Sequence, residues 1–292
     1  METFLHDISW VLPLRSDLNT QIFNAFTLLG YTEFFLVMLP LGYWLWDKPM
    51  FTRLAILVGI VGLSNSFLKD LFEDSRPPLA LALDGRVGDS FGFPSGHAQI
   101  AVAMWLWLAY EIKRSWAWVI AIVIAAGVCF SRLYLGVHDV EDVLGGALLG
   151  LACIVIFRGF LSDAAWANAT PLIHLAAIAA LVPLVMFAWP RDPVPAAMYA
   201  LIGFLLFWFA GALLERNIIG SRRHENWLVA GLAAIVGVAV LFGLMKVAGD
   251  QLAAAGLDKQ VALVAQLSLV SFYVTFIAPA LFRLLRVAGP AG

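Results

Sequence analysis

Three short polar stretches interrupt long apolar runs in this sequence, and their side chains suit chemistry on a phosphate group. The stretches are LKDLFEDSRPP at 68–78, FPSGH at 93–97 and SRLYLGVHDVED at 131–142. Their cationic, histidine and paired acidic residues are Lys69, Arg76, His97, Arg132, His138 and Asp142. Lysine and arginine bind tetrahedral oxyanions, and arginine offers forked donors that match phosphate oxygens. Two histidines then suit a displacement at phosphorus, in which one attacks and the other protonates the departing oxygen.

The first two stretches predict an anion site, although each also has a simpler interpretation. Ser95 is a candidate N-cap and Gly96 leaves backbone amides unobstructed, so this helix start offers N–H donors and the positive end of a dipole. His97 then lies in the first turn, beside whatever binds there. The alternatives are helix capping without a ligand for FPSGH, and snorkelling interfacial cations for Lys69 and Arg76.

The third stretch pairs a histidine with a carboxylate. If a helix begins near Asp139, then His138 and Asp142 lie on one helix face, where the carboxylate can accept the ring N–H and fix the tautomer. This spacing favours His138 over His97 as the attacking group. The alternative is that Asp139 and Asp142 cap the helix and that His138 is an interfacial bystander.

The elements that must position these residues are membrane-spanning helices. The chain has 292 residues, of which 62% are hydrophobic and 13% charged, with a mean hydropathy of +0.89. A soluble domain needs a more polar surface, and a bilayer core takes about 20 apolar residues per helix. We therefore predict an all-α fold, a polytopic membrane helical bundle of about nine transmembrane helices. The apolar segments are about 22–46, 51–71, 96–112, 115–133, 142–161, 171–189, 194–214, 226–247 and 260–285.

The distribution of positive charge predicts the orientation of the chain. Lysine and arginine are more numerous in the loops near 48–53, 113–114, 216–223 and 283–286 than in the alternate loops, and cytoplasmic loops retain the excess of positive charge. We expect an extracytoplasmic N-terminus, a cytoplasmic C-terminus and the three polar stretches at the outer face of the plasma (inner) membrane. The net charge of −2 indicates no nucleic-acid partner.

The three stretches resemble the signature motifs of the type 2 phosphatidic acid phosphatase (PAP2) superfamily. The matching patterns are Lys69-x6-Arg76-Pro77, Pro94-Ser95-Gly96-His97 and Ser131-Arg132-x5-His138-x3-Asp142. The resemblance implies that His138 is the nucleophile that forms a phosphohistidine, that Asp142 orients it, and that His97 acts as general acid and later as base. It also implies that neither a metal nor another cofactor is used. The residues that would hold the phosphoryl oxygens are Lys69, Arg76, Ser95, Gly96 and Arg132.

The resemblance says little about the end of the chain, and it suggests two parts. We expect a PAP2-like catalytic membrane core of about six helices at 1–190, and a C-terminal membrane extension of about three helices and unknown function at 191–292. The lysine motif follows the second predicted span, an arrangement more similar to glucose-6-phosphatases and sphingosine-1-phosphate phosphatases than to six-helix bacterial members. Gly146 and Gly150 indicate close helix packing, and Glu33 is an ionisable group within the first predicted span.

The expected function is that of an integral membrane phosphatase for a lipid phosphomonoester or diphosphate, with the phosphorylated lipid substrate and membrane lipids as partners. Two enzymatic alternatives are a phosphatase of a soluble phosphomonoester, such as a sugar phosphate, and a lipid phosphotransferase. The non-enzymatic alternative is a membrane transporter or binding protein. Neither the lipid's identity nor the oligomeric state follows from the sequence.

Overall fold

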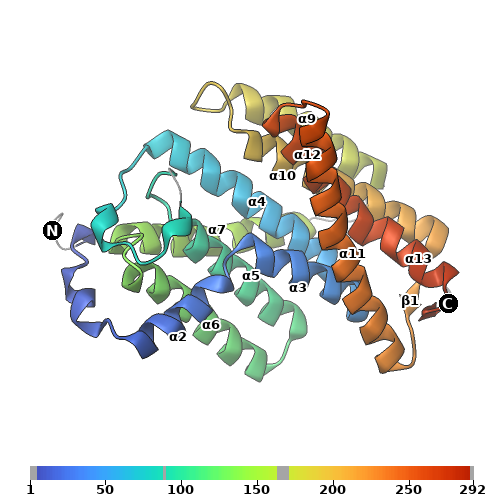
Figure 1. The fold of residues 1–292 in the computed structure, drawn as a ribbon, viewed down its shortest axis with the longest axis horizontal. Coiled ribbons are helices and arrows are strands. Elements are labelled where there is room, and N and C mark those ends of the chain that lie inside the picture. Colours follow the sequence, from blue (N-terminus) through green and yellow to red (C-terminus); the bar gives the residue numbers. More distant parts are fainter. Residues whose placement is uncertain (1–4, 88–89, 163–170, 290–292) are drawn as a thin grey trace. The chain divides into compact units, whose positions relative to one another are not determined.

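The computed structural model describes residues 5–87, 90–162 and 171–289, which are helical almost throughout (Figure 1). They form two compact units, which are described separately below. Unit 1 contains Met1–Phe35 and Ile60–Ala164, and unit 2 contains Leu36–Gly59 and Ala165–Gly292.

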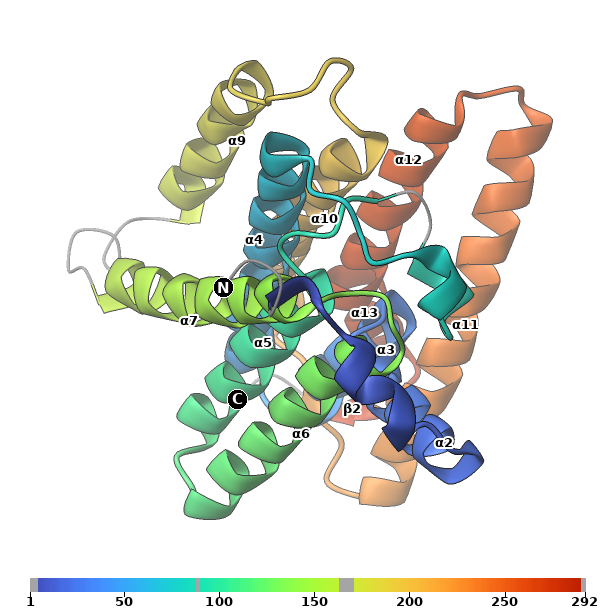
Figure 2. The ribbon, with the colours of Figure 1, turned by 90° about the vertical axis from the view of Figure 1, so that its left-hand side faces the viewer.

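Unit 1 is built on helices that surround the three polar stretches. Its main helices are α2 (Asp17–Leu28), the second half of α4 (Lys48–Phe72), α5 (Gly96–Ile112), α6 (Ser115–Tyr134) and α7 (Val140–Ser162). The short helices η1 (Ser9–Leu14), η2 (Leu79–Leu81) and η3 (Gly85–Val87) lie in its connecting segments. Helix α5 packs against both α6 and α7, and α2 packs against α6 (Figure 2). Buried apolar residues of the third stretch itself, such as Leu135 and Val137, form part of its core.

Two glycines allow α7 to approach α5 closely. A Cβ atom at Gly146 would lie 2.4 Å from the carbonyl oxygen of Ser95, and one at Gly150 would lie 2.6 Å from that of Gln99. Real Cβ atoms do not approach a backbone oxygen so closely, so any larger residue would push the helices apart. The interpretation of these glycines as packing residues is confirmed, and their contacts fix α7 against the start of α5.

Unit 2 holds the remaining helices. They are most of α3 (Thr32–Leu45), the first half of α4, α9 (Pro171–Phe187), α10 (Ala196–Leu214), α11 (Trp227–Ala254), α12 (Lys259–Phe272) and α13 (Ala278–Leu284), with π-helical turns η4 (Glu215–Ile219) and η5 (Tyr273–Ile277). The two-residue strands β1 (Arg222–Arg223) and β2 (Ala288–Gly289) pair antiparallel. Helix α10 packs along α12, and Lys48 Nζ lies 2.5 Å from Glu215 Oε1 in a partly buried ion pair.

The predicted helical bundle is confirmed, but the count of nine spans is not. A helix is present at each of the nine predicted segments. Among the described residues, six helices are long and apolar enough to cross a membrane, or up to seven if a bent pair is one span. Helices α5 and α9, with 17 residues each, fall short of that length. The expected boundary at residue 190 stays a prediction.

The first predicted span, 22–46, requires a correction. Instead of one continuous helix, the chain forms α2 and α3, whose axes differ by 53°. Helix α2 ends at Leu28, and the turn through Gly30 and Tyr31 precedes Thr32. Glu33 lies exposed in the first turn of α3.

Candidate active site

A buried histidine–carboxylate pair lies at the centre of unit 1. His138 lies two residues before α7, Asp142 lies in the first turn of that helix, and His138 Nδ1 lies 2.8 Å from Asp142 Oδ2. Both residues are buried. A carboxylate at this distance accepts the Nδ1–H, which leaves the lone pair of Nε2 available. The predicted pairing therefore has the geometry that orients a nucleophilic imidazole.

The turn that carries His138 depends on a glycine. Gly136 has a φ of 69°, a left-handed conformation that residues with a side chain rarely adopt. A Cβ atom there would also lie 2.2 Å from the carbonyl oxygen of Leu81. This turn reverses the chain between Arg132, in the last turn of α6, and His138, just before α7.

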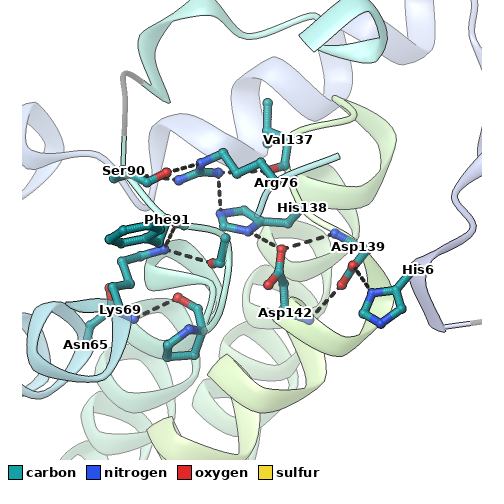
Figure 3. Close-up of polar contacts among 12 residues, drawn as sticks. His6, Asn65, Lys69, Arg76, Ser90, Phe91, Val137, His138, Asp139 and Asp142 are labelled. Atoms are coloured by element: carbon teal, nitrogen blue, oxygen red, sulfur yellow. Dashed lines mark hydrogen bonds and ion pairs between the residues drawn. The ribbon is translucent and has the colours of Figure 1, made fainter. Parts of the chain in front are cut away.

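Arg76 faces the other side of the imidazole, as Figure 3 shows. Its Nη1 lies 3.0 Å from His138 Nε2 and donates to the carbonyl oxygen of Val137 at 2.7 Å. Its remaining nitrogens donate to Ser90, from Nε to the carbonyl oxygen at 2.7 Å and from Nη2 to the hydroxyl at 2.8 Å. Burial lowers the pKa of His138 well below 6.5, and the positive charges of Arg76 and Lys69 lower it further. His138 is therefore neutral at neutral pH.

The last two turns of α4 hold the segment that leads into α5. Lys69 Nζ donates to the carbonyl oxygens of Phe91 and Gly92, the latter at 2.8 Å. One turn earlier, the Asn65 amide donates to the carbonyl oxygen of Pro94 at 3.0 Å. Lys69 thus lies in the cluster of Figure 3, with its donors directed at the backbone beside the predicted phosphate cradle.

The predicted helix start is present, with one difference at its cap. Helix α5 begins at Gly96, and Ser95 occupies the N-cap position, but its hydroxyl makes no capping hydrogen bond. Instead, the Ser95 amide donates to the carbonyl oxygen of Asp142 at 2.9 Å, which joins the second stretch to the third. A Cβ atom at Gly96 would lie 2.9 Å from Asn65 Oδ1, so only glycine fits there without a shift.

Arg132 lies in a second cluster, which the sequence did not indicate. It is fully buried and donates from Nη1 to the Thr27 hydroxyl and to Asp84 Oδ2, the latter at 3.4 Å. Asp84 also accepts a hydrogen bond from the Tyr31 hydroxyl. Burial opposes the ionisation of Asp84, but hydrogen bonds from Tyr31 and Arg86 outweigh it and hold its pKa at about 2. Asp84 is therefore a permanent negative charge beside Arg132.

Seven buried side-chain polar atoms have no hydrogen-bond partner among the described residues, and three of them are the indole nitrogens of Trp105, Trp107 and Trp208. The other four are Ser95 Oγ, His97 Nε2, Arg132 Nε and Asp142 Oδ1. Buried polar atoms in folded proteins are nearly always paired, so an unpaired group of this kind calls for an explanation. Three of the four can donate, which suits the oxygens of a bound anion. All four belong to residues that were predicted to form the site.

Four neighbours of the site were not predicted from the sequence: Thr27, Tyr31, Asp84 and Asn65. Asp84 is one of two acids between the first two stretches, and no spacing distinguishes it from Asp89. Asn65 gave a usable signal, because a polar amide within an apolar helix usually has a specific partner. Tyr31 gave none, because its role depends on the bend between α2 and α3.

Comparison with known proteins identifies the family. A model of the PAP2 superfamily matches residues 50–166. Phosphatidylglycerophosphatase B of Bacillus subtilis is 34% identical over 160 residues, which cover 50% of this chain and 77% of that protein. The chain belongs to the PAP2 superfamily. All eight predicted site residues lie within the PAP2 match, whereas Thr27 and Tyr31 precede it.

Other relatives of this PAP2 protein are matched over a smaller part of their length. Human sphingosine-1-phosphate phosphatase 2 is 34% identical over 143 residues, which cover 46% of this chain and 36% of that protein. The chain therefore spans about a third of that relative. A crystal structure of a transmembrane PAP2-type phosphatidylglycerolphosphate phosphatase from Bacillus subtilis is 31% identical. It has a TM-score of 0.47 and covers 52% of this chain and 81% of that one.

Proposed function

We propose that this protein is a membrane-embedded phosphatase that hydrolyses a lipid phosphomonoester or diphosphate through a phosphohistidine intermediate. The geometry of His138 carries the proposal: Nδ1 is bonded to Asp142, and Nε2 faces the guanidinium of Arg76. A neutral imidazole whose lone pair is on Nε2 is the form that can attack phosphorus, once Arg76 turns from Nε2 to the phosphate. The names of its relatives, which include phosphatidylglycerophosphatase B and sphingosine-1-phosphate phosphatase 2, support a lipid phosphate as substrate.

The reaction would proceed in two displacements. His138 Nε2 forms a bond to phosphorus while the bond from phosphorus to the lipid oxygen breaks, and His97 gives its proton to that oxygen. His97 then takes a proton from water, whose oxygen attacks phosphorus and breaks the bond to His138. Asp142 stabilises the positive charge that the imidazole gains in the first step.

The phosphoryl oxygens would be held by the cationic and helix-start groups. Preorganised donors stabilise the charge of the transition state most effectively in a site shielded from water. Arg132 Nε and Ser95 Oγ are unpaired buried donors among the described residues, and Arg76 would turn its guanidinium from His138 Nε2 to the phosphate. The groups assigned to this cradle are Lys69, Arg76, Ser95, Gly96 and Arg132.

We further propose that the site opens at the extracytoplasmic face. A headgroup can reach a site at helix ends while its acyl chains stay in the bilayer. The excess of lysine and arginine in the alternate loops supports this orientation.

The direct test is the release of inorganic phosphate by detergent-solubilised protein. Candidate substrates are phosphatidate, phosphatidylglycerophosphate, sphingosine phosphate, a polyprenyl diphosphate and glucose phosphate. We expect lipid phosphates to be hydrolysed, and His138→Ala to lower turnover on the order of 10³-fold or more. His224→Ala, a matched change in unit 2, should retain activity.

Several outcomes would contradict the proposal. Full turnover by His138→Ala would refute the nucleophile assignment. Hydrolysis of glucose phosphate alone would indicate a soluble substrate, and transfer of phosphate to an acceptor lipid would indicate a phosphotransferase. Inhibition by a metal chelator would contradict the metal-independent mechanism.

A further inference from the structure

The break between α2 and α3 places two residues directly on His97. A Cβ atom at Gly30 would lie 2.6 Å from His97 Cδ2, so the glycine backbone contacts the imidazole. The rings of Tyr31 and His97 meet edge to face, with centroids 4.4 Å apart and planes at 80°. His97 Nε2 has no hydrogen-bond partner among the described residues, so packing on the rest of the ring determines where this atom points.

The same tyrosine is connected to the buried arginine of the site. The Tyr31 hydroxyl donates to Asp84 Oδ2, the oxygen that also faces Arg132 Nη1 at 3.4 Å. Arg86 covers the Tyr31 ring, with its guanidinium carbon 3.9 Å from the centroid, and binds Asp84 Oδ1 at 3.1 Å. One side chain therefore contacts His97 through its ring and Arg132 through its hydroxyl and Asp84.

We propose that Tyr31 is a positioning residue for the reaction, and that the α2–α3 break belongs to the active site. The proposal rests on the proposed function, because it assigns Tyr31 to the orientation of the general acid, His97, and of the phosphate-binding Arg132. A continuous helix through residues 28–32 would not present the Gly30 backbone and the Tyr31 ring together to one imidazole. The break lies before the residues matched by the PAP2 model, so the assignment concerns a part of the chain outside that match.

The two contacts predict separate kinetic effects. A general acid matters most when the leaving group is a poor one, such as the alkoxide of a lipid, and least for an aryl leaving group such as p-nitrophenolate. Displacement of His97 should therefore slow lipid phosphates selectively. Loss of the hydroxyl should loosen Asp84 and, through it, Arg132, which would hold the phosphate of every substrate. The binding of both substrates should therefore weaken alike.

The experiment compares phosphatidate in detergent micelles with p-nitrophenyl phosphate. For Tyr31→Ala we expect kcat on phosphatidate to fall roughly 10- to 100-fold, a part of the usual contribution of general acid catalysis, with kcat on the aryl phosphate changed less than about 3-fold. Tyr31→Phe keeps the ring, so we expect the ratio of the two kcat values to stay near wild type while KM rises for both substrates. Tyr110→Ala in α5 is the matched control, and it should change neither the ratio of the two kcat values nor the KM for either substrate.

A second variant tests the same contact with His97 independently, in case Tyr31→Ala does not fold. Gly30→Ala adds only one methyl group, directed at His97 Cδ2, and should reproduce the selective loss on phosphatidate. An equal loss on both substrates in Tyr31→Ala and Gly30→Ala would overturn the positioning role. Wild-type protein that releases phosphate from none of the candidate lipid phosphates would instead contradict the proposed function, so the two failures are distinguishable.

Discussion

His138 lies among several positive side chains, and their charges determine which form of the imidazole is present. Burial is the largest cause of its lowered pKa, followed by the charges of Arg76, Lys69 and Arg132. The neutral ring is the attacking form, so on the acid side of the pH profile activity should be lost as His138 becomes protonated. Because the pKa is lowered, this loss should occur below pH 6.5, the ordinary value for histidine.

Removal of one of these cations should move the acid limb of the pH profile. In Arg76→Gln the imidazolium is less disfavoured, so the pKa of His138 rises and the limb of kcat/KM shifts to higher pH, on top of a lower maximum rate. The measurement is kcat/KM from pH 4.5 to 8 on one substrate, so that ionisation of the substrate itself cancels between variants. Arg222→Gln, in unit 2, should leave the limb in place. An unmoved limb in Arg76→Gln would show that His138 does not control it.

At the scale of residues, prediction succeeded where the chemistry is contained in local spacing. His138 and Asp142 are four residues apart, and this short spacing brings their side chains together at the start of α7. Asp84 and Tyr31 were missed because 53 positions separate them, and nothing short of the folded chain shows that they share a hydrogen bond.

Some glycines of helix α7 are packed against α5, whereas Gly159 faces open space. Substitutions at one glycine of each kind test how helix packing positions the site. A Cβ atom at Gly150 would meet the carbonyl oxygen of Gln99 at 2.6 Å, whereas one at Gly159 would meet nothing within 4 Å. Gly150→Val should therefore cost about 1–3 kcal/mol of stability through overpacking, and it should lower activity by shifting α7 against α5. Gly159→Val should be close to neutral. Thermal unfolding in detergent measures both, and equal melting temperatures would contradict close packing at Gly150.

At the scale of elements, apolar length predicted the presence of helices well and their continuity poorly. The segment 22–46 is apolar along most of its length, and Gly30, one of two glycines within it, did not indicate a bend. The bend depends on contacts between the Gly30–Tyr31 turn and His97, which lie 66 or more positions away in the chain. Helix α5 was predicted with its observed bounds, because the cap at Ser95 and the polar residues Lys113 and Arg114 mark both ends.

For the whole molecule, the proposed orientation can be tested with a membrane-impermeant thiol reagent on intact cells. Glu141, at the start of α7, and Glu225, before α11, are both exposed and suit replacement by cysteine. We expect Glu141→Cys to be labelled in intact cells, and Glu225→Cys only after permeabilisation. Wild-type protein, whose Cys129 and Cys153 are half-buried, gives the background. The reverse pattern would place the site at the cytoplasmic face.

The path of the chain between the two units limits how the protein can be shortened. Residues 36–59 belong to unit 2, although unit 1 both precedes and follows them. Within unit 2, the Trp44 indole donates to the carbonyl oxygen of Val274 at 2.8 Å, and Lys48 pairs with Glu215. In a fragment that stops at residue 190, residues 36–59 would lack their contacts with Glu215 and Val274. Expression of residues 1–190 alone should therefore yield an unstable product, and the two pieces 1–190 and 191–292, co-produced, should rescue each other.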